Sequence, residues 1–148
     1  MKFNIDDNKK FWDEYAIKSK DNPFGAHSDY DIVELENDFI ISELKNRKTR
    51  TLLDIGCGNG QRTLLFSKYV EGKVEGRDYS QEMINHANQL LEVNPELKDK
   101  IKFKTEDVNN LDTATYDVIT SCRCFVNQPS KEKQVELFQK LYSKLNPG

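Results

Sequence analysis

Apolar residues recur at helical spacing through the first third of the chain. They predict one amphipathic helix over residues 7–20 and a second helix that begins behind Asp29, whose side chain can serve as its N-cap. The second helix is expected to bury an apolar face made of Ile32, Leu35, Phe39, Ile40 and Leu44.

The pattern changes at residue 50, where short apolar runs begin to alternate with helical stretches. Buried strands are expected at residues 50–55, 73–77, 101–105 and 116–120. Helices are expected at residues 63–70, behind Ser80 and behind Ser130. The two later helices are predicted to bury Met83, Ile84, Ala87, Leu90 and Leu91 in the first, and Val135, Phe138, Leu141, Tyr142 and Leu145 in the second. Strands that alternate with helices predict parallel βαβ units, so the expected fold class is α/β.

Composition narrows the class of protein. A length of 148 residues fits one domain with a real core, and 36% hydrophobic residues beside 32% charged ones describe a water-soluble protein. The 25 acidic and 22 basic residues give a net charge of −3, which disfavours a nucleic-acid partner. No apolar run is long enough for a signal-peptide core or a membrane span. A cytoplasmic protein without membrane contact is therefore expected.

The chain has three cysteines, Cys57, Cys122 and Cys124. An odd number, with two of them only two positions apart, predicts reduced thiols instead of a disulfide framework. A Cys-x-Cys pair without a nearby histidine or a second pair supplies too few ligands for zinc, so no metal site is expected.

The strongest chemical signal is the glycine loop after the first predicted strand. Asp54 is followed by Gly56, Gly58 and Gly60, and then by a predicted helix. Glycines let the backbone turn sharply and approach a ligand where a Cβ would collide, and the free amides of a helix start face that ligand. Taken alone, the same residues would also suit a tight turn that binds nothing.

Polar residues also follow the other predicted strands. Asp78 ends the second strand, where a carboxylate can accept hydrogen bonds from both hydroxyls of a ribose. Asp107 follows the third strand and can accept a hydrogen bond from an adenine amino group. The carboxyl ends of parallel strands meet at one edge of a sheet, so these residues are expected around one ligand. A dinucleotide site fits less well, because its Gly-x-Gly-x-x-Gly fingerprint would require a glycine at position 61, which is Gln61.

This ordered set resembles the class I S-adenosylmethionine-dependent methyltransferase family from about residue 50 to residue 148. The resemblance implies a three-layer Rossmann-like fold, with an N-terminal helical cover over residues 1–48 and a cofactor-binding core over residues 49–148. It implies S-adenosylmethionine as cofactor, S-adenosylhomocysteine as product and a small-molecule methyl acceptor. The cofactor contacts that it implies are Asp54, Gly56, Cys57 and Gly58 near the methionine part, Asp78 at the ribose, Tyr79 against the adenine, Asp107 and Val108 at the adenine edge, and Ser121 and Cys122 near the amino group.

Three polar residues are weaker candidates for acceptor chemistry. His27 carries an imidazole, which exchanges protons near neutral pH, although a histidine in a polar loop is more often solvated. Arg123 and Asn127 follow the fourth strand, where the resemblance implies acceptor contacts. Many relatives have a histidine near Asn127, which this sequence lacks. No catalytic residue is assigned.

The last residues resemble the segment that precedes a fifth strand and an antiparallel pair in relatives. The mostly parallel sheet is therefore expected to be incomplete, with the fourth strand as an exposed edge. Such an edge predicts a homodimer, covering by the last helix, or aggregation. The alternative function is a truncated, non-catalytic module that binds the cofactor or a partner without turnover.

Overall fold

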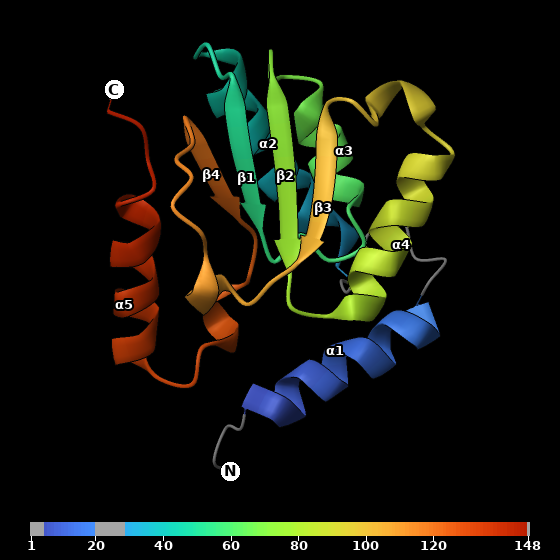
Figure 1. Ribbon diagram of the computed structural model, residues 1–148, viewed down its shortest axis with the longest axis vertical. Helices are drawn as coiled ribbons and strands as arrows, with labels where there is room; N and C mark the ends of the chain where they lie inside the picture. The colour runs from blue at the N-terminus through green and yellow to red at the C-terminus, as the bar shows by residue number, and fades with distance from the viewer. Residues whose placement is uncertain (1–4, 20–28, 148) are drawn as a thin grey trace.

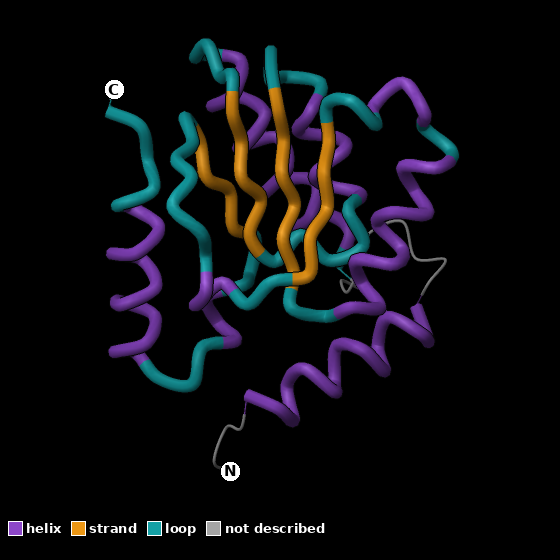
Figure 2. The backbone as a smooth tube through the Cα atoms, viewed as in Figure 1, coloured by secondary structure: helices purple, strands orange, loops and turns teal. Residues whose placement is uncertain are grey.

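The computed structural model describes residues 5–19 and 29–147 of the chain (Figure 2). Four strands form one sheet in the order β3-β2-β1-β4. They are β1 (Thr51–Ile55), β2 (Lys73–Asp78), β3 (Ile101–Thr105) and β4 (Val118–Ser121). All the pairings within this sheet are parallel, which confirms the predicted α/β class.

The helices lie close to their predicted positions. Their bounds are α1 (Ile5–Ser19), α2 (Tyr30–Lys45), α3 (Gln61–Ser67), α4 (Gln81–Glu92) and α5 (Lys131–Tyr142), with short 3-10 helices η1 (Pro95–Leu97), η2 (Val108–Asn110) and η3 (Phe125–Asn127). The side chains of Asp29, Ser80 and Ser130 each accept a hydrogen bond from the backbone N–H three residues ahead, which confirms the three N-caps. No helix in the described ranges is long and apolar enough to cross a membrane.

Two apolar clusters lie on opposite faces of the sheet and make a three-layer domain (Figure 1). One cluster joins β1, β2 and β3 to α2, α3 and α4, and its most buried members include Leu44, Leu52, Phe66, Val74 and Ala87. The other joins β1 to α5 through Leu53, Ile55, Leu137 and Leu141. Helix α1 lies across the carboxyl ends of the strands, where the arrowheads point in Figure 1.

The predicted buried faces of α2 and α5 are partly wrong. On α2, the buried positions are Val33 and Leu44, while Ile32, Leu35 and Phe39 are exposed. On α5, Leu137 and Leu141 are buried, and the exposed residues are Val135, Phe138, Tyr142 and, just beyond the helix, Leu145. Both helices carry apolar residues on two faces, so periodicity alone does not select the face that packs. On α4 the predicted face is confirmed, with Met83, Ile84, Ala87 and Leu91 buried.

The fourth strand begins later than predicted. Tyr116 lies outside β4 and instead forms an isolated parallel bridge with Leu145. The Tyr116 N–H donates to the Lys144 carbonyl, and the Asn146 N–H donates to the Tyr116 carbonyl, both at 2.8 Å. Within the described sheet, β3 and β4 are the two edge strands.

Candidate functional site

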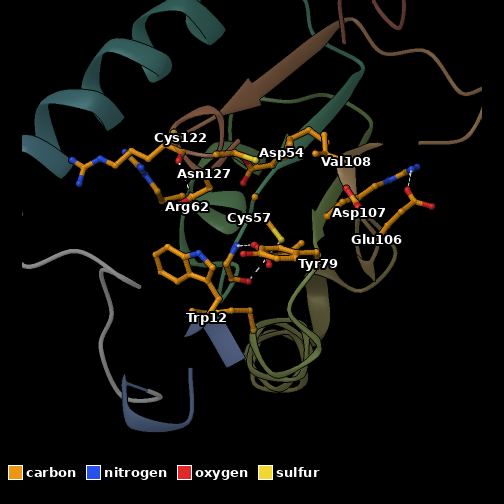
Figure 3. Close-up of a pocket in the computed structure, with 18 of the residues that line it drawn as sticks. Trp12, Asp54, Cys57, Arg62, Tyr79, Glu106, Asp107, Val108, Cys122 and Asn127 are labelled. Atoms are coloured by element: carbon orange, nitrogen blue, oxygen red, sulfur yellow. Dashed lines mark hydrogen bonds and ion pairs between the residues drawn. The ribbon is translucent and has the colours of Figure 1, made fainter. Parts of the chain in front are cut away.

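A cavity of about 250 Å³ opens at the carboxyl ends of the strands, next to α1 (Figure 3). In Figure 3, Trp12 lies on the α1 side of the cavity and Asp54 and Cys122 lie on the opposite side, while Arg62 and Glu106 flank it at left and right. The cavity is lined by most of the residues that the sequence singled out: Asp54, Gly56, Cys57, Gly58, Asp78, Tyr79, Asp107, Val108, Cys122, Arg123 and Asn127. Ser121 lines a second cavity between α2 and β4. His27 lies outside the described residues.

The glycine loop turns at the end of β1 with positive φ angles of 69° at Gly56, 53° at Gly58 and 80° at Gly60. The N–H groups of Gly56 and Cys57 donate to the Arg77 carbonyl at 2.8 and 3.2 Å, which fixes the loop to the end of β2. A Cβ added at Gly58 would lie 4.0 Å from its nearest neighbour, the Met83 sulfur, so the loop leaves open space here. The backbone at Gly58 can therefore approach a ligand directly.

Asp78 is the buried acid of the site, with only 9% of its surface exposed. Its Oδ2 accepts from the Gly58 N–H at 3.0 Å and its Oδ1 from the Ser80 N–H at 2.9 Å. Burial raises the pKa of Asp78 to about 6, although both backbone hydrogen bonds act in the opposite direction. Each oxygen has a lone pair left for another donor, so the carboxylate can accept two further hydrogen bonds.

Asp54 is buried at the end of β1, and its carboxyl group binds the elements that follow the loop. Thr63 and Thr120 donate hydroxyl hydrogen bonds to its two oxygens at 2.6 and 2.9 Å. Burial raises the pKa of Asp54, and the two hydroxyl groups counteract that effect. The carboxyl group thus links β1 to α3 and β4 beneath the cavity.

Another wall of the cavity is formed by the segment after β3. Asp107 caps η2 and accepts from the Asn109 N–H at 2.8 Å. Val108 is buried beside it, and both residues line the cavity. Tyr79 also lines the cavity, and its hydroxyl is buried without a hydrogen-bond partner among the described residues.

Beyond β4, an ion-pair network connects the site to α2. Glu36 accepts from Arg62 at 2.7 Å and from Arg123 at 3.0 Å. Burial opposes ionisation of Glu36, but the two guanidinium groups outweigh it and lower the pKa. Arg123 adopts a φ of 65°, in the left-handed region that non-glycine residues rarely occupy. Such local strain is typical of functional sites.

The three cysteines are free thiols that line the cavity. Burial raises the pKa of Cys122 and of Cys124 to about 12, and it raises the pKa of Cys57 well above the ordinary value. Because the thiolate is the nucleophile and metal ligand, the raised pKa disfavours both roles for these thiols. Within the described ranges, no group of three or more acidic, histidine or cysteine side chains is placed to hold a metal ion.

A family model described as a methyltransferase domain matches residues 52–148. The chain belongs to this family. The methyltransferase domain therefore accounts for all four strands and the glycine loop, and the sequence resemblance to this family is confirmed.

Curated relatives of the methyltransferase domain are longer than this chain. Protein 235L of Invertebrate iridescent virus 6, described as a candidate methyltransferase, is 29% identical over 127 residues, which cover 82% of this chain and 44% of the relative. An uncharacterized methyltransferase of Schizosaccharomyces pombe is 42% identical over 65 residues, which cover 43% of this chain and 21% of the relative. The chain spans about half the length of the relatives that match most of it.

Solved structures share the fold at low sequence identity. Magnesium protoporphyrin IX methyltransferase from Synechocystis PCC 6803, crystallised with S-adenosylmethionine, has a TM-score of 0.77 at 18% identity over 96% of this chain and 72% of that chain. The cyclase SpnF has a TM-score of 0.62 at 19% identity over 78% of this chain and 42% of that chain. These likenesses confirm the Rossmann-like fold of the methyltransferase domain and no more.

Several cavity residues were missed at the sequence level. Arg62, Arg77 and Cys124 line the cavity, and none of them was a candidate. Arg77 precedes Asp78 directly, and Arg62 follows the glycine loop by two positions, so both lay next to recognised motifs. Cys124 is positioned by the turn after β4, which no local pattern predicts.

Proposed function

We propose that this chain binds S-adenosylmethionine in the cavity and forms the cofactor-binding part of an enzyme that methylates a small molecule. The observation that carries the proposal is the Asp78 carboxylate, which is buried at the end of β2, bonded to the Gly58 N–H and open to further donors. A pair of ribose hydroxyls supplies two donors at once. Family membership supports the same ligand.

The remaining lining residues fit an adenosine that carries an amino acid group. Arg62 Nη1 and the Tyr79 hydroxyl are both buried without a hydrogen-bond partner among the described residues, and both residues line the cavity. A buried donor without a partner costs free energy, which a polar ligand would recover. Asp107 and Val108 lie where they can meet the adenine edge. The open space at Gly58 suits close approach of the ligand to the backbone.

When bound, the cofactor supplies a methyl group already activated on its sulfonium. The protein's part is then to orient the acceptor and to exclude water. Trp12 on α1 lines the cavity and can shield it, while Arg123 and Asn127 lie at the β4 side as candidates for acceptor contacts. The acidic net charge of −3 supports a small-molecule acceptor over nucleic acid. The three free thiols support a cytoplasmic location.

Calorimetry with S-adenosylhomocysteine tests the proposal. The wild-type chain is expected to bind, and Asp78→Ala is expected to lose on the order of 2–4 kcal/mol of binding free energy, because two charge-assisted hydrogen bonds disappear. Asp38→Ala is a matched control that removes an exposed carboxylate on α2 that is absent from the cavity lining. Equal affinity of the wild-type and Asp78→Ala chains would contradict the placement of the ribose.

A second candidate is a module that binds the cofactor or a partner without turnover. One observation favours it: the same fold occurs in a cyclase. Fold alone does not specify the reaction. A methyl-transfer assay on a panel of small acceptors separates the two, because only the enzyme releases S-adenosylhomocysteine.

We also propose that two copies of this chain pair through the edge of β4. This strand ends the described sheet, and exposed apolar side chains flank it on α2 (Ile32, Leu35, Phe39) and on α5 (Val135, Phe138, Tyr142). A two-fold axis perpendicular to the sheet would bring each apolar helix face against its own copy. Light scattering coupled to size-exclusion chromatography is expected to show a dimer, which Phe39→Lys with Phe138→Lys converts to a monomer. A wild-type monomer across the micromolar range would exclude the pairing.

A further inference from the structure

Arg77 is a buried cation on the sheet, and the cofactor-binding motif does not account for its side chain. Only 3% of this side chain is exposed, and the residue lies in β2, an inner strand of the sheet. Its guanidinium contacts Glu75 at 2.6 Å, Asp112 at 3.0 Å and the Tyr116 hydroxyl at 2.8 Å, and it pairs closely with Glu106. Burying a cation is costly unless it is fully paired, so this arrangement needs all of its partners.

The partners of Arg77 span one segment of the chain. Glu106 begins the segment that connects β3 to β4, Asp112 lies in its middle and Tyr116 lies near its end. One guanidinium therefore binds the connection, residues 106–116, at three places. Figure 1 shows this connection returning from the carboxyl end of β3 to the start of β4.

The connection also supplies a wall of the cavity. Glu106, Asp107, Val108 and Asn109 all line it, and Arg77 lines it as well. Other contacts also hold this wall: the Glu106 N–H donates to the Asp78 carbonyl at 2.8 Å, the Tyr116 hydroxyl donates to Glu75 at 3.0 Å, and Lys104 pairs with Glu106 at 2.6 Å. Lys140 and Lys144 donate to the Asn109 and Asp112 carbonyls. Among these side chains, that of Arg77 bonds to three residues of the connection. The main chain of Arg77 meanwhile accepts from the glycine loop. The same residue thus touches two parts of the cavity through separate groups.

We propose that Arg77 is a positioning residue, which fixes residues 106–116 against the sheet so that Asp107 and Val108 can select adenine. This inference rests on the proposed function for its ligand. The electrostatics agree with it: Glu106 has a lowered pKa because Lys104 and Arg77 outweigh the effect of its burial, and hydrogen bonds from Ala114 and Arg77 lower the pKa of Asp112. Both carboxylates are ionised partners of the guanidinium.

The test combines hydrogen exchange with ligand discrimination. In Arg77→Met, a substitution of similar length, the glycine loop keeps its carbonyl partner because that contact is main-chain. Amides of Asn110 and Ala114, which are hydrogen-bonded within the connection, are expected to exchange about tenfold faster or more once the charge-assisted contacts are lost. Affinity for S-adenosylhomocysteine is expected to fall by about tenfold, while its inosine analogue, already disfavoured by Asp107, changes little.

Two further variants keep the result interpretable. Glu106→Gln preserves the shape of the side chain and leaves the Arg77 guanidinium in place. It is expected to give smaller changes of the same kind in amide exchange and in affinity, and it can be measured even if Arg77→Met folds poorly. Arg47→Met removes a surface guanidinium that pairs with Glu43 at 2.7 Å, and it is expected to change neither exchange nor discrimination.

The outcomes separate this inference from the proposed function. Unchanged exchange at Asn110 and Ala114 in folded Arg77→Met or Glu106→Gln would overturn it. An equal loss of affinity for the adenine and inosine ligands would also overturn it, because a merely stabilising residue does not alter their ratio. Failure of the wild-type chain to bind S-adenosylhomocysteine would instead reject the proposed function, and exchange would still decide whether Arg77 fixes the connection.

Discussion

The cavity at the carboxyl ends of the strands differs from the flank beside β4, which we define as the exposed apolar side chains of α2 (Ile32, Leu35, Phe39) and α5 (Val135, Phe138, Tyr142). The two regions differ in whether their side chains are buried and hydrogen-bonded or exposed and apolar. Around the cavity, buried polar groups such as Asp54 and Asp78 have two or more hydrogen bonds each. Along the flank, large apolar side chains are exposed, including Leu35 at 71%, Phe39 at 68% and Phe138 at 62%. The cavity is a polar site whose donors and acceptors can still bind a ligand, whereas the flank is an apolar surface that is still exposed.

This contrast separates ligand binding from association. Polar groups that retain lone pairs favour a small polar ligand. Exposed apolar side chains on neighbouring elements favour contact with another protein surface instead. Changes in the cavity are therefore expected to alter folding and affinity, while changes on the flank are expected to alter association alone.

The glycine loop provides the sharpest test within the cavity. A Cβ at Gly60 would lie 2.6 Å from Phe103 and 2.9 Å from Ala87, at a φ of 80°. Gly60→Ala is therefore expected to lower the free energy of unfolding by about 2–4 kcal/mol, measured by urea denaturation. Gly58→Ala has open space around the new methyl group, so it is expected to cost only about 1 kcal/mol and yet to weaken S-adenosylhomocysteine binding. Equal losses of unfolding free energy in Gly60→Ala and Gly58→Ala would contradict the difference in packing around the two glycines.

The Glu36 network is expected to give an intermediate effect. Glu36→Gln leaves Arg62 and Arg123 without their shared anion, and thermal unfolding is expected to show a loss of about 1–2 kcal/mol. The control is Glu43→Gln, which removes the partner of Arg47 from an exposed pair on the same helix and is expected to cost under about 0.5 kcal/mol. Matching losses would mean that the network at the cavity is no stronger than a surface pair.

Substitutions on the flank are expected to have the smallest effect on the unfolding free energy. Phe138→Lys replaces an exposed side chain and is expected to change the unfolding free energy of the monomer by no more than about 0.5 kcal/mol. The neighbouring Leu137→Ala, at a position only 1% exposed, is expected to cost about 2–4 kcal/mol in the same urea titration. A large loss of unfolding free energy in Phe138→Lys would show that the side of α5 that carries Phe138 is covered.

The same contrast explains what the sequence could predict. Most cavity candidates lie at or just after the end of a strand, so a local pattern brings Asp78 and Asp107 to the cavity once the strands are known. The packed face of a helix depends on the sheet beneath it, and α5 offers two apolar faces of which Leu137 and Leu141 belong to the one that packs. Local periodicity cannot choose between them.

Contacts between distant segments were equally beyond local patterns. Arg77 joins the cavity wall only because Glu106, Asp112 and Tyr116 fold back over β2. Ser121 lines the second cavity, between α2 and β4, and no local pattern predicts this. The division between a helical cover at residues 1–48 and a core at residues 49–148 stays a prediction.

The central claim, that Asp78 binds the ribose of the cofactor, is tested most directly by the titration of its own carboxyl group. With ¹³C-labelled aspartate, and Asp78→Ala to assign the resonance, the free chain is expected to show a pKa of about 6. Two hydroxyl donors favour the ionised form, so saturating S-adenosylhomocysteine is expected to lower that pKa by about one unit or more. By linkage, the protonated form binds more weakly, and affinity is expected to fall as the pH drops below 6. A pKa that stays unchanged when S-adenosylhomocysteine is bound would contradict the account.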